Sequence, residues 1–333
     1  MVNIETRDDL KTVQGQTAPE RCGQNDFRGK SVFRHGLDGS QLKLIAVLTM
    51  LADHIAFLLL GRGYIPALAA ELRRLAGAGT TQAAYTTLRA SYDSWLLAYR
   101  VMRSIGRIAF PIYAFLLVEG FFHTRNWRRY TVRLAVFALL SEIPFNLMTA
   151  SHMVSPVAQN VFFTLLLGLL MMKAMDTAGQ WPGLHRSGWP AFRIGGIKSK
   201  EGRQPNQPAP HPSGQPEFPA ATGSGHFLQL IIILAAAFLA WCLHTDYDYD
   251  GILLIAFFYC LRNERWRGCL MGFAWMLCTQ GQWHHIPGYV ISFGLIWLYN
   301  GKRGRQPWKY AFYLFYPAHM LVLFGIYQSL FTR

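Results

Sequence analysis

Apolar residues along this chain fall in blocks of roughly 16 to 20 positions, and short polar stretches separate the blocks. An unpaired backbone N–H or C=O group is costly in lipid, so continuous apolar blocks of this length are expected to be helices that cross a membrane. The pattern therefore predicts an all-α fold, a polytopic transmembrane helical bundle of about nine spans. The expected spans are residues 42–60, 105–123, 130–148, 160–175, 226–243, 249–261, 266–280, 286–299 and 309–330.

Composition agrees with this fold class. Of the 333 residues, 52% are hydrophobic and 15% are charged, whereas a soluble domain carries about 25% charged residues. The blocks exclude a soluble enzyme, a disordered chain and a fibrous protein. The net charge of +14 comes from basic residues between the apolar blocks, as expected for cytoplasmic loops of a membrane protein. We therefore expect membrane lipids, and no nucleic acid, as partners of the basic surfaces.

The distribution of Lys and Arg among the connections predicts the orientation. The amino-terminal tail and the second, fourth, sixth and eighth connections are basic, whereas the third, fifth and seventh contain no Lys or Arg. This alternation predicts a cytoplasmic amino terminus and an external carboxyl terminus in a multi-pass protein of the cell inner (cytoplasmic) membrane. The first connection, residues 61–104, is expected to be an external loop with a short surface helix around residues 65–75. It carries six arginines, but long loops follow the charge rule less strictly.

Two further segments are polar. Residues 1–41 form a predicted cytoplasmic tail without the apolar core of a secretory signal, so the first span is expected to be an uncleaved anchor. Residues 176–225 are rich in Pro, Gly, Ser and Gln and are predicted to be a disordered cytoplasmic linker within the transmembrane domain 42–333. The five cysteines lack the spacing of metal ligands, so we expect no disulfide framework and no metal site.

Ionisable side chains inside the spans are the candidate functional residues. The insertion of each such side chain at the centre of a membrane costs roughly 2.5 to 3.5 kcal/mol of free energy, so each is expected to have a partner, a water-filled cavity or a functional role. In the first span Lys43 and His54 share one helical face, while Asp53 points elsewhere. His319 lies near mid-depth in the last span. Two histidines suit general base and acid catalysis near neutral pH, but the sequence does not tell whether His54 and His319 meet.

The second and third spans also contain ionisable residues. Arg107 lies toward the outside, whereas Glu119 and His123 approach the cytoplasm. Glu142 lies near the middle of the third span. It either pairs with Arg107 or a protonated histidine, or takes part in catalysis, and the residues leave both interpretations open. Asn160, at the outer end of the fourth span, is expected to cap or cross-link helices.

A cluster of arginines follows the second span. Such a cluster could hold the phosphates of a nucleotide-bearing donor through bidentate hydrogen bonds. The positive-inside rule and anionic lipid headgroups would produce the same cluster, and the residues by themselves favour that second interpretation. The cluster consists of Arg125, Arg128, Arg129 and Arg133.

Six strings stand out in chain order: LKLIAVLTMLADH, IGRIAFPIYAFLLVEGFFHTRN, RLAVFALLSEIPFN, QNVFFTLLLGLL, DYDGILLIAFFY and FYLFYPAHMLVL. Together they resemble the TraX family of integral membrane proteins. The founding activity of that family is N-acetylation of the amino terminus of conjugative pilin. The family is also similar to a wider group of membrane acyltransferases that modify surface glycans, place a catalytic histidine in the first span and take the acyl group from cytoplasmic acetyl-CoA.

The resemblance assigns roles to particular residues. It implies that His54 is the base, that Asp53 is its neighbouring support and that the arginine cluster binds the phosphates of acetyl-CoA. Asn146 departs from the pattern, since many relatives are expected to have an Asp at this position. The resemblance covers most spans but not the amino-terminal tail, most of residues 61–104 or the linker.

The expected function is that of an integral membrane acetyltransferase. It would move an acetyl group from cytoplasmic acetyl-CoA, with no metal, to an amine or hydroxyl of a pilin or envelope glycan. The alternatives are a carrier or channel that uses the intramembrane His and Glu residues, and a pilus-assembly protein without catalysis. The expected catalytic residues are Asp53, His54, Arg107, Glu142 and His319, and the expected acetyl-CoA site comprises Lys43, Glu119, His123, Arg125, Arg128, Arg129 and Arg133.

Overall fold

The computed structural model describes residues 36–78, 81–179, 224–304 and 311–332. Within these ranges the regular structure is helical, apart from two isolated β-bridges, which confirms the all-α prediction for the described chain. A π-helical segment, Ala56–Tyr64, joins α1 to α2, and short 3-10 helices, Arg262–Glu264 and Trp283–His285, precede α9 and α10. The α-helices are α1 (Gly39–Ile55), α2 (Ile65–Gly77), α3 (Gln82–Gly106), α4 (Ala109–His123), α5 (Trp127–Ala150), α6 (Val161–Gly179), α7 (Ser224–Cys242), α8 (Asp248–Cys260), α9 (Arg265–Gln280), α10 (Ile286–Trp297) and α11 (Ala311–Phe331).

Five helical rods among the described residues are long and apolar enough to cross a membrane, so the chain is a multi-pass membrane protein. The apolar helix His226–Cys242 is shorter. Helices α8, α9 and α10 have 13, 16 and 12 residues, fewer than the roughly 20 that a membrane-crossing helix needs. Nine spans and a cytoplasmic amino terminus stay predictions. The five rods are Gly39–Gly77, Gln82–His123, Trp127–Ala150, Val161–Ala178 and Ala311–Phe331.

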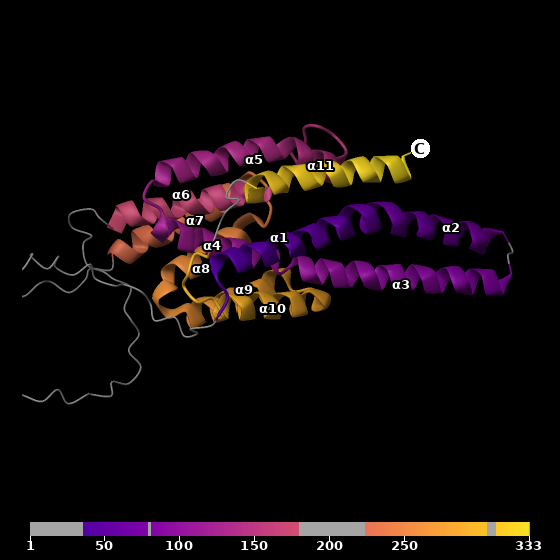
Figure 1. The fold of residues 1–333 in the computed structure, drawn as a ribbon, viewed down its shortest axis with the longest axis horizontal. Helices are drawn as coiled ribbons and strands as arrows, with labels where there is room; N and C mark the ends of the chain where they lie inside the picture. The colour runs from indigo at the N-terminus through magenta and orange to yellow at the C-terminus, as the bar shows by residue number, and fades with distance from the viewer. Residues whose placement is uncertain (1–35, 79–80, 180–223, 305–310, 333) are drawn as a thin grey trace, which may run out of the picture.

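The described residues of 61–104 form a helical hairpin, which includes a helix where the sequence predicted a short one, around residues 65–75, and extends well beyond it. Helix α1 continues through the π-helical segment into α2, and α3 returns beside it (Figure 1). The low hydropathy of residues 61–104 does not prevent helix formation, because the segment is rich in Ala, Leu and Arg, which have high helix propensity whether they are polar or apolar. The rod Gly39–Gly77 has 39 residues, so at about 1.5 Å per residue it is about 58 Å long, well beyond a hydrocarbon core of about 30 Å. The hairpin therefore projects from the bundle.

The second predicted span begins with a break in the helix. Helix α3 ends at Gly106 and α4 begins at Ala109. Pro111 lies in the first turn of α4, and because its nitrogen carries no hydrogen it cannot donate to the carbonyl of Arg107. Gly106 lets α1 approach closely, since a Cβ at this position would overlap the carboxylate of Asp53. The break and the glycine together bring Arg107 next to α1.

The start of α1 is fixed by local hydrogen bonds. The Asp38 side chain accepts from the backbone N–H groups of Ser40 and Gln41, and the Gln41 side chain accepts from the N–H of Asp38. This is a capping box, which satisfies N–H groups that have no partner in the first turn. Leu37 in addition donates its N–H to the carbonyl of Leu298, at the end of α10.

Both polar segments of the sequence prediction overlap ordered structure at their ends. Residues 36–41 of the predicted tail belong to the described chain, and residues 1–35 lie outside it. Residues 176–179 of the predicted linker complete α6, and α7 begins at residue 224. The disorder predicted for the linker concerns residues 180–223, which lie outside the described residues.

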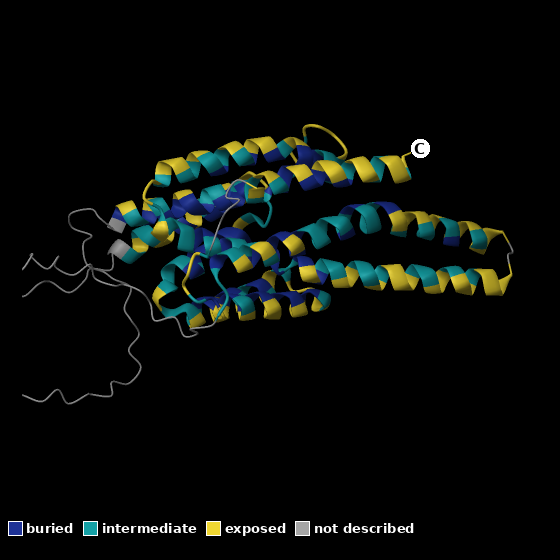
Figure 2. Cartoon of the chain, viewed as in Figure 1, coloured by how far each residue is buried: buried dark blue, intermediate teal, exposed yellow. Residues whose placement is uncertain are grey.

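The apolar core is centred on α4 and α8, which are buried over most of their length and contact each other. The outer helices α5, α7 and α11 bury one side and expose Leu, Ile, Val and Phe side chains on the other (Figure 2). In water such faces would be unfavourable, but lipid tails are as apolar as these side chains. The exposed apolar faces thus support the membrane location.

Two glycines of α10 allow a test of how this helix packs against the end of α3. A Cβ on Gly288 would overlap the backbone carbonyl of Ser104, whereas a Cβ on Gly294 would meet nothing within 4 Å. We expect Gly288→Ala to lower the free energy of unfolding by about 1–3 kcal/mol, because a backbone carbonyl cannot move aside as a flexible side chain can. Thermal unfolding of the purified protein in detergent measures the effect. Gly294→Ala is the control, and equal unfolding temperatures for the two variants would contradict this packing.

Candidate functional site

Two histidines far apart in the sequence meet inside the bundle. His54 lies near the end of α1 and His319 lies on α11, and the Nδ1 atom of His54 is 2.6 Å from the Nε2 atom of His319. The ring planes differ by 4°, with 4.9 Å between the ring centroids. The Nδ1 atom of His319 is 2.7 Å from the carbonyl oxygen of Phe315. The contact that the sequence left open is therefore made.

Asp53, the residue before His54, is paired with two arginines. Its Oδ2 atom is 2.5 Å from Nη1 of Arg103, and its Oδ1 atom is 3.5 Å from Nη2 of Arg107. The three side chains are between 12% and 20% exposed, so the ion pairs are largely shielded. The buried Nε atom of Arg107 makes no hydrogen bond within the described residues, which leaves one N–H donor of this side chain for another group.

Arg103 was not among the predicted site residues, because it lies in residues 61–104, the predicted external loop. The signal that could have found it is the spacing of four residues between Arg103 and Arg107, which places two basic side chains on one face of a helix.

Glu142 is held by amides. Its carboxylate accepts hydrogen bonds from the side-chain nitrogens of Asn146, at 3.2 Å, and Asn160, at 2.6 Å. Within the described part of the chain, Glu142 does not form the ion pair with Arg107 or a histidine that one interpretation predicted, because Arg107 lies against α1 instead. Asn160 also accepts from the N–H of Phe162 and donates to a backbone carbonyl of α5. The prediction that Asn160 caps and cross-links helices is confirmed.

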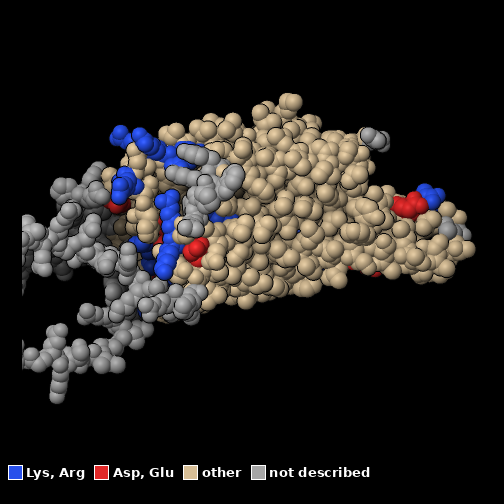
Figure 3. Space-filling view, in the orientation of Figure 1, with Lys and Arg blue, Asp and Glu red and all other residues tan. Residues whose placement is uncertain are grey.

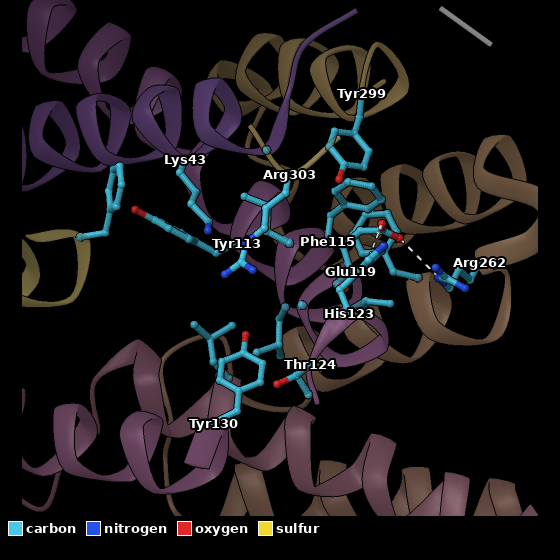
Figure 4. Close-up of a pocket in the computed structure, with 18 of the residues that line it drawn as sticks. Lys43, Tyr113, Phe115, Glu119, His123, Thr124, Tyr130, Arg262, Tyr299 and Arg303 are labelled. Carbon is cyan, nitrogen blue, oxygen red and sulfur yellow. Dashed lines mark hydrogen bonds and ion pairs between the residues drawn. The ribbon is translucent and has the colours of Figure 1, made fainter. Parts of the chain in front are cut away.

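A cavity of about 1700 Å³ opens beside α1, α4 and the connections around α9 and α11. Figure 4 shows Lys43, Arg303 and Tyr130 projecting toward its interior from different segments. The lining residues include seven Lys and Arg side chains and one carboxylate, Glu119. Such an excess of positive charge favours a polyanionic ligand. The seven cations are Lys43, Arg125, Arg133, Arg262, Arg265, Lys302 and Arg303.

Several of these cations are held in place by neighbours. Arg262 pairs with Glu119 at 3.4 Å, and its guanidinium lies 4.0 Å from the centre of the Phe122 ring. Arg265 donates to the carbonyl of Tyr299 at 2.5 Å. Lys and Arg side chains also gather at this end of the face shown in Figure 3, whereas the middle of that face carries few charges. The cavity mouth is thus part of a basic end of the bundle.

The structure divides the predicted acetyl-CoA residues into two groups. Lys43, Glu119, His123, Arg125 and Arg133 all line the cavity. The other two arginines of the predicted cluster, Arg128 and Arg129, are exposed in the first turn of α5 and are not part of the lining. The guanidinium of Arg128 lies over the ring of Trp127.

Four cations of the lining were not predicted as binding residues. Arg262, Arg265, Lys302 and Arg303 come from connections that the sequence analysis used only to predict orientation. The signal was present, because connections predicted to lie on the same side of the membrane end near one another in a bundle. Their basic residues could have been grouped with Arg125.

The cavity reaches Tyr316, a neighbour of the histidine pair. Its lining includes Met50, one turn before His54 on α1, and Tyr316, one turn before His319 on α11. The ring of Tyr316 lies with its centroid 6.1 Å from that of His54 and 5.9 Å from that of His319. Phe162 packs edge-on against Tyr316 with 5.0 Å between centroids. Neither histidine is part of the lining, and Tyr316 lies between the cavity and the two histidine rings.

Known proteins resemble this chain over most of its length. A family model described as TraX protein matches residues 38–184 and 220–327. The probable fimbrial assembly protein FimC, serogroup H1, of Dichelobacter nodosus is 25% identical over 303 residues, which cover 85% of this chain and 93% of that protein. No solved structure matches the chain. Within the described residues no group of three or more His, Cys, Asp or Glu side chains could hold a metal ion.

Asp246 lies in the turn between α7 and α8, close enough to Arg107 and Arg103 for their charges to act on it. Its backbone N–H donates to the carbonyl of Gln159 at 2.8 Å, and its carbonyl accepts from the hydroxyl of Thr164. Burial raises the pKa of Asp246 to about 6; Arg107 opposes the increase and Asp53 adds to it. The folded protein therefore favours the protonated form of this carboxyl more than the unfolded chain does.

The raised pKa predicts a dependence of stability on pH. A carboxyl whose pKa is raised by folding contributes stability that is complete below its unfolded pKa of about 4 and is lost as the pH rises through about 6. We expect Asp246→Asn, which cannot ionise, to unfold at a higher temperature than the unchanged protein above pH 7, and at a similar temperature near pH 4. Asp93→Asn, on the exposed face of the hairpin, is the control. A difference that does not shrink at low pH would contradict the prediction.

Proposed function

Because this chain belongs to the TraX family, we propose that it is a pilus-related membrane acetyltransferase. It moves the acetyl group of acetyl-CoA to an amine or hydroxyl of a pilin or envelope component. The observation that carries the proposal is a cavity lined by seven cations and by Tyr316, whose ring contacts both His54 and His319. The similarity to a probable fimbrial assembly protein supports the pilus-related part.

The cavity suits a nucleotide thioester in size and charge. Its volume of about 1700 Å³ exceeds the roughly 300–1,000 Å³ of pockets that hold drug-sized ligands. The phosphates of the donor bind among the cations of the mouth, where Arg side chains form charge-assisted hydrogen bonds. The less polar arm that carries the acetyl group lies along the aromatic interior, past Tyr113, Tyr130 and Phe162, with the thioester at Tyr316.

The histidine supplies the proton chemistry. His54 removes a proton from the acceptor amine or hydroxyl as it attacks the thioester carbonyl, the C–S bond breaks, and the proton passes to the departing CoA thiolate. The unsatisfied Nε–H of Arg107 is a donor for the negative charge that develops on the carbonyl oxygen. An acetyl-histidine intermediate is an alternative route to the same products.

Removal of the base is expected to stop the transfer. We expect His54→Ala to lower acetyl transfer by about 10²–10⁴-fold, the usual contribution of a general base, with the protein still inserted in the membrane. Purified protein is incubated with radiolabelled acetyl-CoA and envelope membranes from cells that lack it. His152→Ala, in an exposed connection, should retain full activity. Full transfer by the His54 variant would remove this histidine from the mechanism.

The charge of the cavity predicts which arginines bind the donor. Arg133→Gln removes a cation of the lining and should weaken acetyl-CoA binding by about 10–100-fold, since a hydrogen bond to a charged group contributes about 1.5–3 kcal/mol. Arg128→Gln removes the same charge outside the lining and should bind as the unchanged protein does. Calorimetric titration in detergent compares them, and equal weakening would indicate a nonspecific effect of net charge.

The same purified protein and radiolabelled acetyl-CoA also distinguish an enzyme from a carrier and from a non-catalytic assembly protein. If the unchanged protein neither binds nor transfers the labelled acetyl group, while vesicles that contain it move a solute, it is a carrier. If it does neither and its deletion affects only pilus assembly, it is an assembly protein without catalysis, in keeping with the name of its Dichelobacter nodosus relative.

A further inference from the structure

We propose that His319 is the positioning residue of His54: it accepts a hydrogen bond from His54 Nδ1–H and thereby leaves Nε2 of His54 as the basic atom of the pair. The inference rests on the proposed acetyl transfer, because it specifies the atom that receives the proton. It is carried by the two ring contacts of His319, on the Nε2 side to His54 and on the Nδ1 side to a backbone carbonyl.

The proton positions follow from the carbonyl of Phe315. A carbonyl oxygen only accepts hydrogen bonds, so the Nδ1 atom of His319, 2.7 Å away, must carry the hydrogen. A neutral imidazole has one N–H and one lone pair, so the Nε2 atom of His319 is the acceptor. At 2.6 Å from that acceptor, the Nδ1 atom of His54 must then be the donor. Neutral His54 consequently has its lone pair on Nε2.

Packing around His319 fixes the ring in this orientation. The Phe315 ring stacks on the imidazole of His319 with 4.7 Å between centroids and an angle of 11°. Tyr316 contacts the histidine rings edge-on, and His319 is only 7% exposed. Phe315 and His319 are four residues apart on α11, so the helix itself holds the carbonyl acceptor below the ring. The tautomer of His319 is set by its own helix.

The charges around α1 give His319 a second role, which is to share the positive charge that His54 gains when it takes a proton. Asp53 is one carboxylate between the two arginines Arg103 and Arg107, so an added positive charge on the adjacent His54 is disfavoured. As Nε2 of His54 takes the proton of the acceptor, the hydrogen on its Nδ1 atom can move to Nε2 of His319. The positive charge is then shared with a ring on α11 whose two N–H groups both have acceptors.

The two histidines account for every proton that moves during the transfer. The acceptor loses one proton to Nε2 of His54, its nitrogen or oxygen forms a bond to the acetyl carbon, and the C–S bond of the thioester breaks. The CoA thiolate takes the proton back from Nε2 of His54 while the hydrogen between the rings returns to His54. The products are the acetylated acceptor and CoA, and both histidines are neutral again.

A spectroscopic experiment tests the hydrogen positions without any substrate. The full chain, with 11 histidines, is labelled with ¹⁵N in the histidine rings, and ring nitrogen shifts are recorded in lipid bilayers at a pH where both rings are neutral. We expect His54 and His319 both to carry hydrogen on Nδ1, with the signals assigned through the loss of one set in His54→Asn. Hydrogen on Nε2 of His54 would overturn the proposal.

Two substitutions of His319 test its effect on catalysis. His319→Phe removes the acceptor and is expected to lower kcat for acetyl transfer by about 10–100-fold with an unchanged KM for acetyl-CoA, because the donor still binds while the base is misoriented. His319→Gln offers a side-chain oxygen to His54 Nδ1–H and should recover part of the kcat and the Nδ1–H signal of His54. An unchanged kcat in the Phe variant, or a change in KM alone, would overturn the positioning role.

The outcomes separate this inference from the proposed function. If the tautomers are as expected but the unchanged protein transfers no acetyl group, the proposed enzyme is wrong and the hydrogen-bonded pair is structural. If acetyl transfer depends on His54 but its Nε2 carries hydrogen, the enzyme stands and His319 does not position the base. Should the Phe variant fail to accumulate in the membrane, the spectrum of the unchanged protein and the kcat of His319→Gln decide.

Discussion

The arrangement of this protein depends on one shielded group of charges, the carboxylate of Asp53 between Arg103 and Arg107. A charge in a poorly solvated interior needs a partner, and three such charges constrain the helices that carry them. The group connects α1 to the end of α3 and to the break before α4, and Gly106 makes the approach possible. Since His54 follows Asp53 directly, the same ion pairs determine where α1 presents its histidine to α11.

The cavity and the histidine pair are neighbouring but separate sites, with the aromatic side chain of Tyr316 between them. The basic mouth collects cations from connections far apart in sequence, such as Arg125, Arg262 and Arg303. The histidine pair lies on the other side of Tyr316, between aromatic rings of α11 and the ion pairs of Asp53. In the proposed acetyl transfer, the positive charge would attract the anionic donor, and a less polar interior would strengthen hydrogen bonds near the thioester. One chain would thereby combine binding of a polyanion with proton transfer at a neutral imidazole.

Hydropathy predicted the helical class and most segment positions because lipid permits only structures whose backbone groups are paired internally. It predicted only a short helix within residues 61–104 and missed the length of α2 and α3, where helix formation depends on Ala, Leu and Arg rather than on an apolar block. Single residues were predictable where chemistry restricted them, as at Asn160. Residues of the cavity mouth such as Arg262 were not, because their role depends on which connections end side by side. The contact between His54 and His319 likewise depends on how α1 and α11 pack, which neither sequence segment encodes alone.

Comparison of Glu142 with His54 shows how structural and functional polar residues differ inside this bundle. The carboxylate of Glu142 accepts from the amides of Asn146 and Asn160, so the surrounding residues satisfy the group they bury. His54 is satisfied at Nδ1 by His319, while its Nε2 atom keeps a lone pair for a partner outside that chain of hydrogen bonds. A group that is fully bonded stabilises the fold and has no capacity left for a substrate. The imidazole with an uncommitted nitrogen, next to Tyr316, is therefore the better candidate for chemistry than the better satisfied carboxylate.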